Sequence, residues 1–167
     1  MTRGLALLCL LVSAFLALPA AAALACSGAG AGPSALSDDD YEHAVECLVN
    51  EQRAAAGLRG LRHDTRLARA ASHFSMSMVR QGFFAHVSPQ GSTPGGRAHA
   101  AGYGGGMVGE TIGWGAGALA TPAAIVQGWL ESPAHRAILL GAGFRRIGLG
   151  VAESAPEAAT VTADFGG

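Results

Sequence analysis

The chain is organised around three blocks: Phe83-Phe84-Ala85-His86, Gly109-Glu110-Thr111-Ile112 and Trp129-Leu130-Glu131-Ser132-Pro133-Ala134-His135-Arg136. Each block holds one side chain that can exchange protons or bind a metal, namely His86, Glu110 or His135. Glycines, aromatic residues or a helix start surround each of them. We therefore expect the three side chains to converge on one shallow cleft.

Glu110 is the most informative of the three residues. It lies within 108–112, a run that is otherwise uncharged and that reads as a strand. Burying a carboxylate without a partner is costly, so this position requires one. Arg97, His86 and His135 are the candidate partners.

Two imidazoles and one carboxylate form the protein ligands of many zinc sites, with a water in the fourth position. Zinc is therefore the possible cofactor, with His86, Glu110 and His135 as its ligands, and a bound water could attack esters, amides or glycosides. The spacings of 24 and 25 residues match no metal motif. The alternative is that the three side chains bond to one another and to the backbone and only hold loops in place.

Apolar periodicity and capping residues predict a helix that starts at 38 and ends at a Gly57 C-cap, and a second helix that Asp64 or Thr65 caps and Gly82 stops. A short helix is expected over 94–101, and two more begin at Pro122 and Pro133. Strands are expected over 108–112, 147–152 and 160–165, the last two forming an antiparallel hairpin. On the first helix, Asn50 and Arg53 are placed to bond loops across the domain. This order predicts an α+β fold with helices on both faces of a small sheet.

The N-terminal region reads as an export signal followed by a linker. Arg3, an apolar run over 5–18 and Ala23-Leu24-Ala25 predict a signal peptide over 1–25 and a secreted, extracellular protein. A flexible linker is expected over 26–37, rich in Gly, Ala and Ser. An uncleaved anchor, or a lipoprotein attached through Cys26, are the alternatives.

Cys26 and Cys47 remain after cleavage, because Cys9 leaves with the signal peptide. An even number of cysteines in an oxidising compartment favours a disulfide. Closing a loop of about 20 residues contributes about 3 kcal/mol in the chain-entropy description. Two free thiols are the alternative.

Composition limits the class of partner. The 167 residues carry a formal net charge of -1, and 14% of them are charged. Such a chain lacks the basic surface that binds nucleic acid. No transmembrane segment is expected after cleavage, and we expect a monomer.

Six blocks, taken together, resemble the bacterial branch of the CAP superfamily (cysteine-rich secretory proteins, antigen 5 and pathogenesis-related 1). They are Cys47-Leu-Val-Asn-Glu-Gln-Arg53, Phe84-Ala-His86, Gly109-Glu-Thr-Ile112, Trp129-Leu-Glu-Ser-Pro-Ala-His-Arg136, Phe144-Arg-Arg-Ile-Gly-Leu-Gly-Val151 and Val161-Thr-Ala-Asp-Phe-Gly166. The resemblance covers nearly the whole mature chain and implies a CAP domain over 38–167. The implied fold is a three-layer α-β-α sandwich with a small central antiparallel sheet.

The resemblance also implies a cleft with two His and two acidic residues that sometimes binds zinc. His86 matches the first His and Glu110 matches the first acid. Thr111 stands where the family has Asn, and Ser132 stands where eukaryotic members have a second Glu. The block that carries the family's second His is absent, which leaves His135 as the substitute.

Superfamily members are implicated in binding sterols, fatty acids, glycans or proteins at the cell surface. We therefore expect a binding or scaffold role at the cell envelope or outside the cell, with an unknown envelope, lipid, glycan or protein partner. A zinc-assisted hydrolase of peptide, ester or peptidoglycan bonds, and a lipid or sterol binder, are the alternatives. Ser132, Arg136, Arg97 and Trp114 are expected to line or support the cleft. Trp114, between two glycines, suits stacking on sugar or lipid, and a place in the hydrophobic core is the alternative for it.

Overall fold

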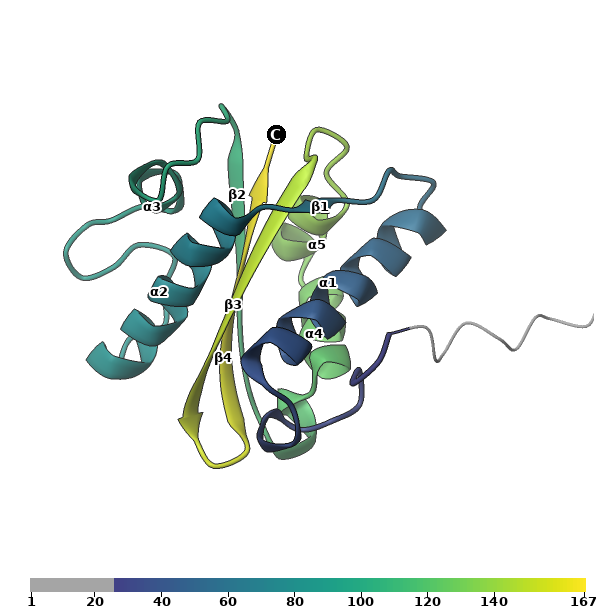
Figure 1. Ribbon diagram of the computed structural model, residues 1–167, viewed down its shortest axis with the longest axis vertical. Coiled ribbons are helices and arrows are strands. Elements are labelled where there is room, and N and C mark those ends of the chain that lie inside the picture. Colours follow the sequence, from purple (N-terminus) through teal and green to yellow (C-terminus); the bar gives the residue numbers. More distant parts are fainter. Residues whose placement is uncertain (1–25) are drawn as a thin grey trace, which may run out of the picture.

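The computed structural model describes residues 26–167, so the predicted signal peptide over 1–25 lies outside the described residues. The described helices are α1 Asp38–Ala55, α2 Thr65–Gln81, α3 Pro94–Ala100, α4 Pro122–Glu131 and α5 Pro133–Leu139, with short 3-10 helices η1 Pro33–Ala35 and η2 Gly117–Ala120. The strands are β1 Arg62–His63, β2 Val108–Ala116, β3 Arg146–Ala155 and β4 Ala158–Gly166. Figure 1 shows their arrangement.

The four strands form one sheet in the order β1-β3-β4-β2. Strands β2, β4 and β3 are antiparallel neighbours, which confirms the predicted antiparallel sheet and its final hairpin. The two-residue β1 was not predicted, and it adds to β3 in parallel, which makes the whole sheet mixed. Strand β2 continues four residues past Ile112, to Ala116.

Helices cover both faces of this sheet, which confirms the three-layer sandwich. In Figure 1, α2 and α3 lie on one side of the strands, and α1, α4 and α5 lie on the other. The main hydrophobic core fills the second side, where Phe165 and Ile147 from the sheet are completely buried. Two buried polar groups are satisfied there, because Tyr41 donates to the carbonyl of Ala120 (2.8 Å) and the Trp129 indole donates to that of Ile112 (2.9 Å).

The first side is built differently, because α2 lies directly on glycines of β3. A Cβ atom at Gly150 would lie 2.1 Å from the backbone nitrogen of Ser72, and one at Gly148 would lie 2.0 Å from that of Ala68. Ser75 of α2 fixes the contact by donating to the carbonyl of Gly150 at 2.8 Å. The close approach leaves the neighbouring strands β4 and β2 to supply the polar groups of this side.

Long-range polar bonds tie the ends of α1 to distant loops, as predicted for Asn50 and Arg53. The Asn50 amide bonds the backbone of Leu61 in both directions, at 2.7 and 3.2 Å. The buried Arg53 guanidinium donates to the carbonyls of Leu139 (2.6 Å) and Gly141 (3.1 Å). These bonds fix the turn that follows α5.

The predicted disulfide between Cys26 and Cys47 is present. It ties the segment 26–37 to α1, and the Ala123 amide of α4 donates to the carbonyl of Ala29 at 2.9 Å. The predicted linker therefore lies against the domain. Among the described helices, none combines the length and apolar character needed to cross a bilayer.

Gly150→Ala should destabilise the protein by at least about 3 kcal/mol, the upper end of overpacking costs, because the new methyl group meets backbone that cannot rotate away. Gly128→Ala in α4 is the matched control, because a Cβ there has no neighbour within 4 Å and should stabilise the helix by up to about 1 kcal/mol. Urea unfolding of both variants measures the difference. Equal stabilities would contradict the close approach of α2 to β3.

Candidate functional site

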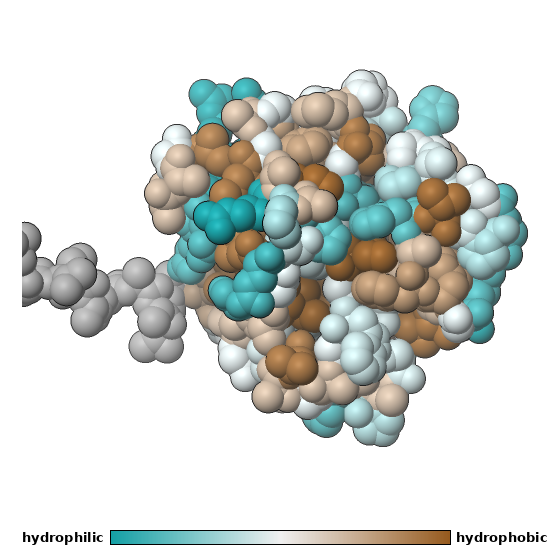
Figure 2. Space-filling view, turned by 180° about the vertical axis from the view of Figure 1, so that it is seen from behind, coloured by the Kyte–Doolittle hydropathy of each residue, from teal (hydrophilic) through white to brown (hydrophobic). Residues whose placement is uncertain are grey.

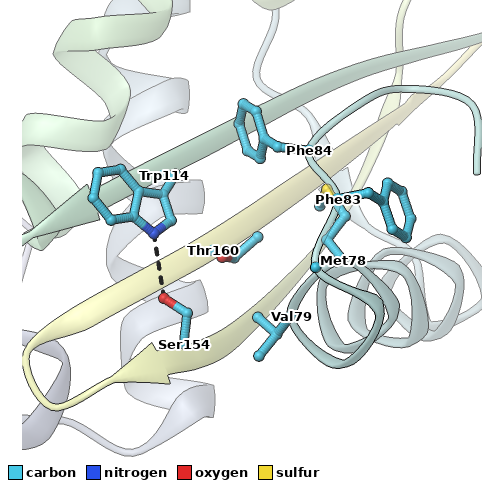
Figure 3. A pocket seen from close by; sticks show the side chains of 8 residues that line it. Met78, Val79, Phe83, Phe84, Trp114, Ser154 and Thr160 are labelled. Atoms are coloured by element: carbon cyan, nitrogen blue, oxygen red, sulfur yellow. Dashed lines mark hydrogen bonds between the residues drawn. The ribbon is translucent and has the colours of Figure 1, made fainter.

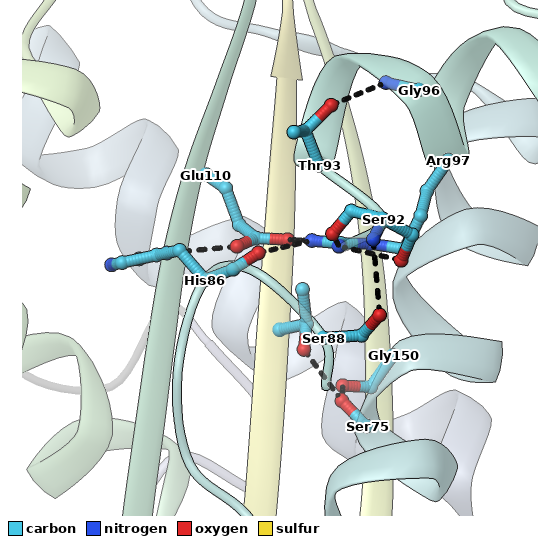
Figure 4. Close-up of polar contacts among 10 residues, drawn as sticks. Ser75, His86, Ser88, Ser92, Thr93, Gly96, Arg97, Glu110 and Gly150 are labelled. Atoms are coloured by element: carbon cyan, nitrogen blue, oxygen red, sulfur yellow. Dashed lines mark hydrogen bonds and ion pairs between the residues drawn. The ribbon is translucent and has the colours of Figure 1, made fainter. Parts of the chain in front are cut away.

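The centre of the candidate site is the carboxylate of Glu110, whose side chain is only 1% exposed. Its strand places it on the face covered by α2 and α3. One oxygen accepts from Nδ1 of His86 at 2.8 Å, and the other is paired with Nη2 of Arg97. The prediction that Glu110 needs a partner is confirmed, and two of the three candidate partners supply it (Figure 4).

Arg97 connects Glu110 to the segment that leads from α2 to α3. Its guanidinium also donates to the carbonyls of His86 (3.1 Å) and Ser92 (2.8 Å), and it stacks on the Phe74 ring with its carbon 3.3 Å from the centroid. Thr93 begins α3 by capping the Gly96 amide, and so orients the helix that carries Arg97. One arginine thus fixes the 83–93 segment, α3 and the sheet relative to one another.

His86 and His135 lie side by side at this site. Their ring centroids are 5.9 Å apart, with an angle of 65° between the ring planes. Since the Glu110 carboxylate accepts from Nδ1 of His86, the proton is assigned to that nitrogen and Nε2 remains free. Burial and then the neighbouring His86 lower the pKa of His135, which keeps it neutral at neutral pH.

Asp164 is a residue of this site that the sequence analysis did not identify. It is the antiparallel partner of Glu110 on β4, so the two carboxyl groups share one face of the sheet. Asp164 is completely buried. Burial, then the adjacent Glu110, raise the pKa of Asp164 to about 8. One signal could have identified Asp164: it is an acidic residue within a strand that is buried along its whole length, where acidic residues are rare.

The other predicted site residues are distributed more widely. Ser132 begins α5, but its side chain makes no capping bond. Arg136 lines a separate pocket with residues of α1 and α4. Thr111, which replaces the family's Asn, is buried, and its hydroxyl has no hydrogen-bond partner within residues 26–167. Of the predicted supporting residues, Arg97 therefore contacts the Glu110 centre directly.

Trp114 lines a different feature, which we call the aromatic groove, of about 570 Å³. Its lining residues are Met78, Val79, Gly82, Phe83, Phe84, Trp114, Ser154 and Thr160. Figure 3 shows the Trp114 indole on β2 across from Val79 of α2, with Thr160 between them. The indole nitrogen donates to the hydroxyl of Ser154 at 3.2 Å, which holds the ring while 58% of the residue stays exposed.

The predicted zinc site finds part of its ligand set in this geometry. His86 offers Nε2, and His135 offers an imidazole beside it. The two Glu110 oxygens are already bonded to His86 and Arg97. Glu110 would therefore orient His86 as a zinc ligand rather than bind the metal itself. Two imidazoles fall short of the three protein ligands usual for zinc with an open position. Zinc binding stays a prediction.

The family assignment rests on most of the described chain. Residues 47–165 match the CAP family, described as the cysteine-rich secretory protein family. The chain belongs to this family, and the resemblance read from its six blocks is confirmed.

Individual relatives agree with this assignment. The chain is 34% identical to the uncharacterized protein YkwD of Bacillus subtilis over 122 residues, which are 73% of this chain and 46% of YkwD. An extracellular protein of Bacillus anthracis containing an SCP domain is 29% identical, with a TM-score of 0.66 over 78% of this chain and 44% of that one. An outer surface protein of Borrelia burgdorferi shares the fold at 21% identity, with a TM-score of 0.66 over 73% of this chain and 88% of that one. The chain thus spans less than half of the two Bacillus proteins.

Zinc uptake at this site should depend on both imidazoles. If the unchanged chain takes up one Zn²⁺ in isothermal titration of untagged protein at pH 7.5, His86→Ala and His135→Ala should each abolish that uptake. Glu110→Gln should weaken it by about 10- to 100-fold, the usual cost of removing a group that orients a ligand. His99→Ala, at an exposed residue of α3, is the matched control. Equal weak uptake by all these proteins would rule out a zinc site here.

Proposed function

We propose that this chain is a binding domain that acts outside the cytoplasm, at the cell envelope or beyond it, and that its ligand is an amphipathic molecule of the lipid type. The observation that carries the proposal is the aromatic groove, where Phe84 and Trp114 are 53% and 58% exposed. Their side chains come from different parts of the chain and line one hollow.

The groove is suited to an apolar ligand. Its lining is aromatic and aliphatic apart from a glycine and two hydroxyl groups, and it includes no charged side chain. Exposed aromatic side chains gain the most from covering by an apolar partner. Seen from behind, the molecule shows its most apolar side chains in several separate patches among weakly apolar, neutral and hydrophilic ones (Figure 2).

The polar end of such a ligand would lie toward the histidines. Phe84 of the groove and His86 are two residues apart on one segment, while Trp114 and Glu110 are four residues apart on β2 and face the same side. Four strand residues span about 13 Å. A molecule with an acyl chain and a polar head is long enough to contact both the groove and His86. Hydrogen-bonding groups then fix the head and apolar burial supplies the affinity, as in many small-molecule sites.

Export is supported by the composition of the N-terminus and by the relatives. Residues 1–25 have the charge, apolar run and small-residue pattern of a signal peptide. The Cys26–Cys47 disulfide suits an oxidising compartment. The two similar structures are described as an extracellular protein and an outer surface protein.

Hydrolysis of a peptide, ester or peptidoglycan bond is the second candidate. The observation that favours it is the hydrogen bond from Nδ1 of His86 to the buried Glu110 carboxylate. Because this bond uses Nδ1, the other ring nitrogen, Nε2, is left to act as a general base. The nearby Ser88 is buried, and its hydroxyl accepts a hydrogen bond from the Ser92 amide. No imidazole of the described residues bonds to this hydroxyl, so Ser88 lacks the base that a serine nucleophile needs.

Palmitate is the probe that tests the binding proposal. Its addition should shift the fluorescence of the exposed Trp114 to shorter wavelength, because the acyl chain replaces water over the indole. Phe84→Ala should weaken binding by about 10-fold or more, since burial of a large aromatic side chain is worth about 1.5–3 kcal/mol. Leu119→Ala is the matched control, because Leu119 is 70% exposed and lies outside the groove.

Equal palmitate affinity of the Phe84 and Leu119 variants, or no binding by the unchanged chain, would contradict the proposal. Turnover of a peptide, ester or peptidoglycan panel that is lost in His86→Ala would favour the hydrolase instead.

A further inference from the structure

Glu157 has an unusual backbone conformation for its residue type. It lies in the turn between β3 and β4, and its φ of 58° makes it the one non-glycine residue with a positive φ among residues 26–167. Residues other than glycine adopt this left-handed region at a cost in free energy, and they keep it where surrounding contacts fix the backbone. The contacts of Glu157 therefore identify what fixes this turn.

Two segments hold Glu157, one through its side chain and one through its carbonyl. The side chain accepts a hydrogen bond from the hydroxyl of Ser34. It also lies so close to Gly32 that a Cβ atom there would come within 2.5 Å of the carboxylate. The carbonyl accepts from the Gly117 amide at 2.7 Å. The turn is thus fixed between the 26–37 segment and the start of η2.

Residues 26–37 form a segment that we call the strap, because both of its ends are attached to α1. Cys26 is bonded to Cys47 of α1, and the Ser37 side chain caps the first turn of that helix. Between these ends, Leu36 packs against the main hydrophobic core. The strap is therefore a fixed support for Glu157.

The same turn carries a residue of the aromatic groove. The pairing of β3 with β4 shifts register between Glu153 and Ala155, so Ser154 stands outside the regular ladder. A bulge of this kind leaves the extra residue unpaired and re-aims its side chain. Ser154 lines the groove, and its hydroxyl accepts from the Trp114 indole at 3.2 Å (Figure 3). The position of the indole therefore depends on the bulge.

The strap contact and the bulge lie next to each other, because Ser34, Ser154 and Glu157 line one hollow of about 460 Å³. We propose that Glu157 is a positioning residue of the aromatic groove. The strap holds Glu157 in its left-handed conformation, and the turn fixed in this way presents Ser154 to the Trp114 indole. The effect of Glu157 on ligand affinity rests on the proposed binding function, whereas its effect on Trp114 does not.

The indole N–H signals of ligand-free protein labelled with nitrogen-15 test the proposal. The chain has two tryptophans, Trp114 and Trp129, and Trp114→Phe assigns their signals. We expect Ser34→Ala and Glu157→Ala to shift the Trp114 signal toward that of an indole without a protein acceptor and to lower its heteronuclear NOE. The Trp129 signal should not change, because its N–H donates to the carbonyl of Ile112 within the core.

Glu157→Gln separates the position of this side chain from its charge. The amide oxygen can accept from Ser34 as the carboxylate does, so the Trp114 signal should match that of the unchanged chain. Two matched controls should also leave this signal unchanged. Ser27→Ala alters another exposed serine of the strap, and Glu153→Ala removes an exposed carboxylate from the same hollow.

Palmitate binding by the same variants extends the test to the ligand. Ser34→Ala and Glu157→Ala should weaken it by about 2- to 10-fold, the range expected when one neutral hydrogen bond is lost, and Glu157→Gln should bind as the unchanged chain does.

Three results overturn the proposal: an unchanged Trp114 signal in both alanine variants, an equal change at Trp129, or palmitate affinity equal to that of the unchanged chain. If the unchanged chain does not bind palmitate, the proposed function fails, and the indole signals alone decide the positioning role.

Discussion

The placement of one buried carboxylate determines how this side of the molecule is assembled. Glu110 lies inside the sandwich, where an isolated charge is not tolerated. Its ion pair with Arg97 and its bond to His86 bring α3 and the 83–93 segment onto the sheet. Charge-assisted bonds to a buried group are stronger than neutral ones, so they compensate for the few apolar contacts that this segment makes.

The two faces of the sheet solve different packing problems. On the side of α1 and α4, large apolar side chains fill the space and form the main core. On the side of α2, Gly148 and Gly150 let the helix backbone approach so closely that little side-chain volume fits over β3. Polar groups of β4 and β2 lie on this same face, and one of them, the Thr162 hydroxyl, accepts a hydrogen bond from Ser75 of α2 at 2.8 Å. This asymmetry places a charged centre and an apolar groove on the same face.

The sequence predicted the helices, the hairpin and the need of Glu110 for a partner, because these follow from local periodicity, caps and the cost of burying a charge. It did not identify Asp164, because strand register pairs residues 54 positions apart and leaves no local trace. Arg136 was expected to support the cleft that holds His135, but successive helix residues point about 100° apart, and Arg136 lines a separate pocket. Strand β1 has only two residues, too few for any pattern. The end of β2, rich in glycine, is a strand because it pairs with β4, a long-range contact that local sequence does not show.

Hydrogen exchange of individual amides in Glu110→Gln tests the central claim most directly. The uncharged amide keeps the shape of the side chain but removes the charge that holds Arg97. The account predicts faster exchange confined to the 83–97 segment, with α1 and β3 unchanged, and no change in Glu153→Gln, at an exposed position. Unaltered exchange in the 83–97 segment, or an equal increase throughout the domain, would contradict it.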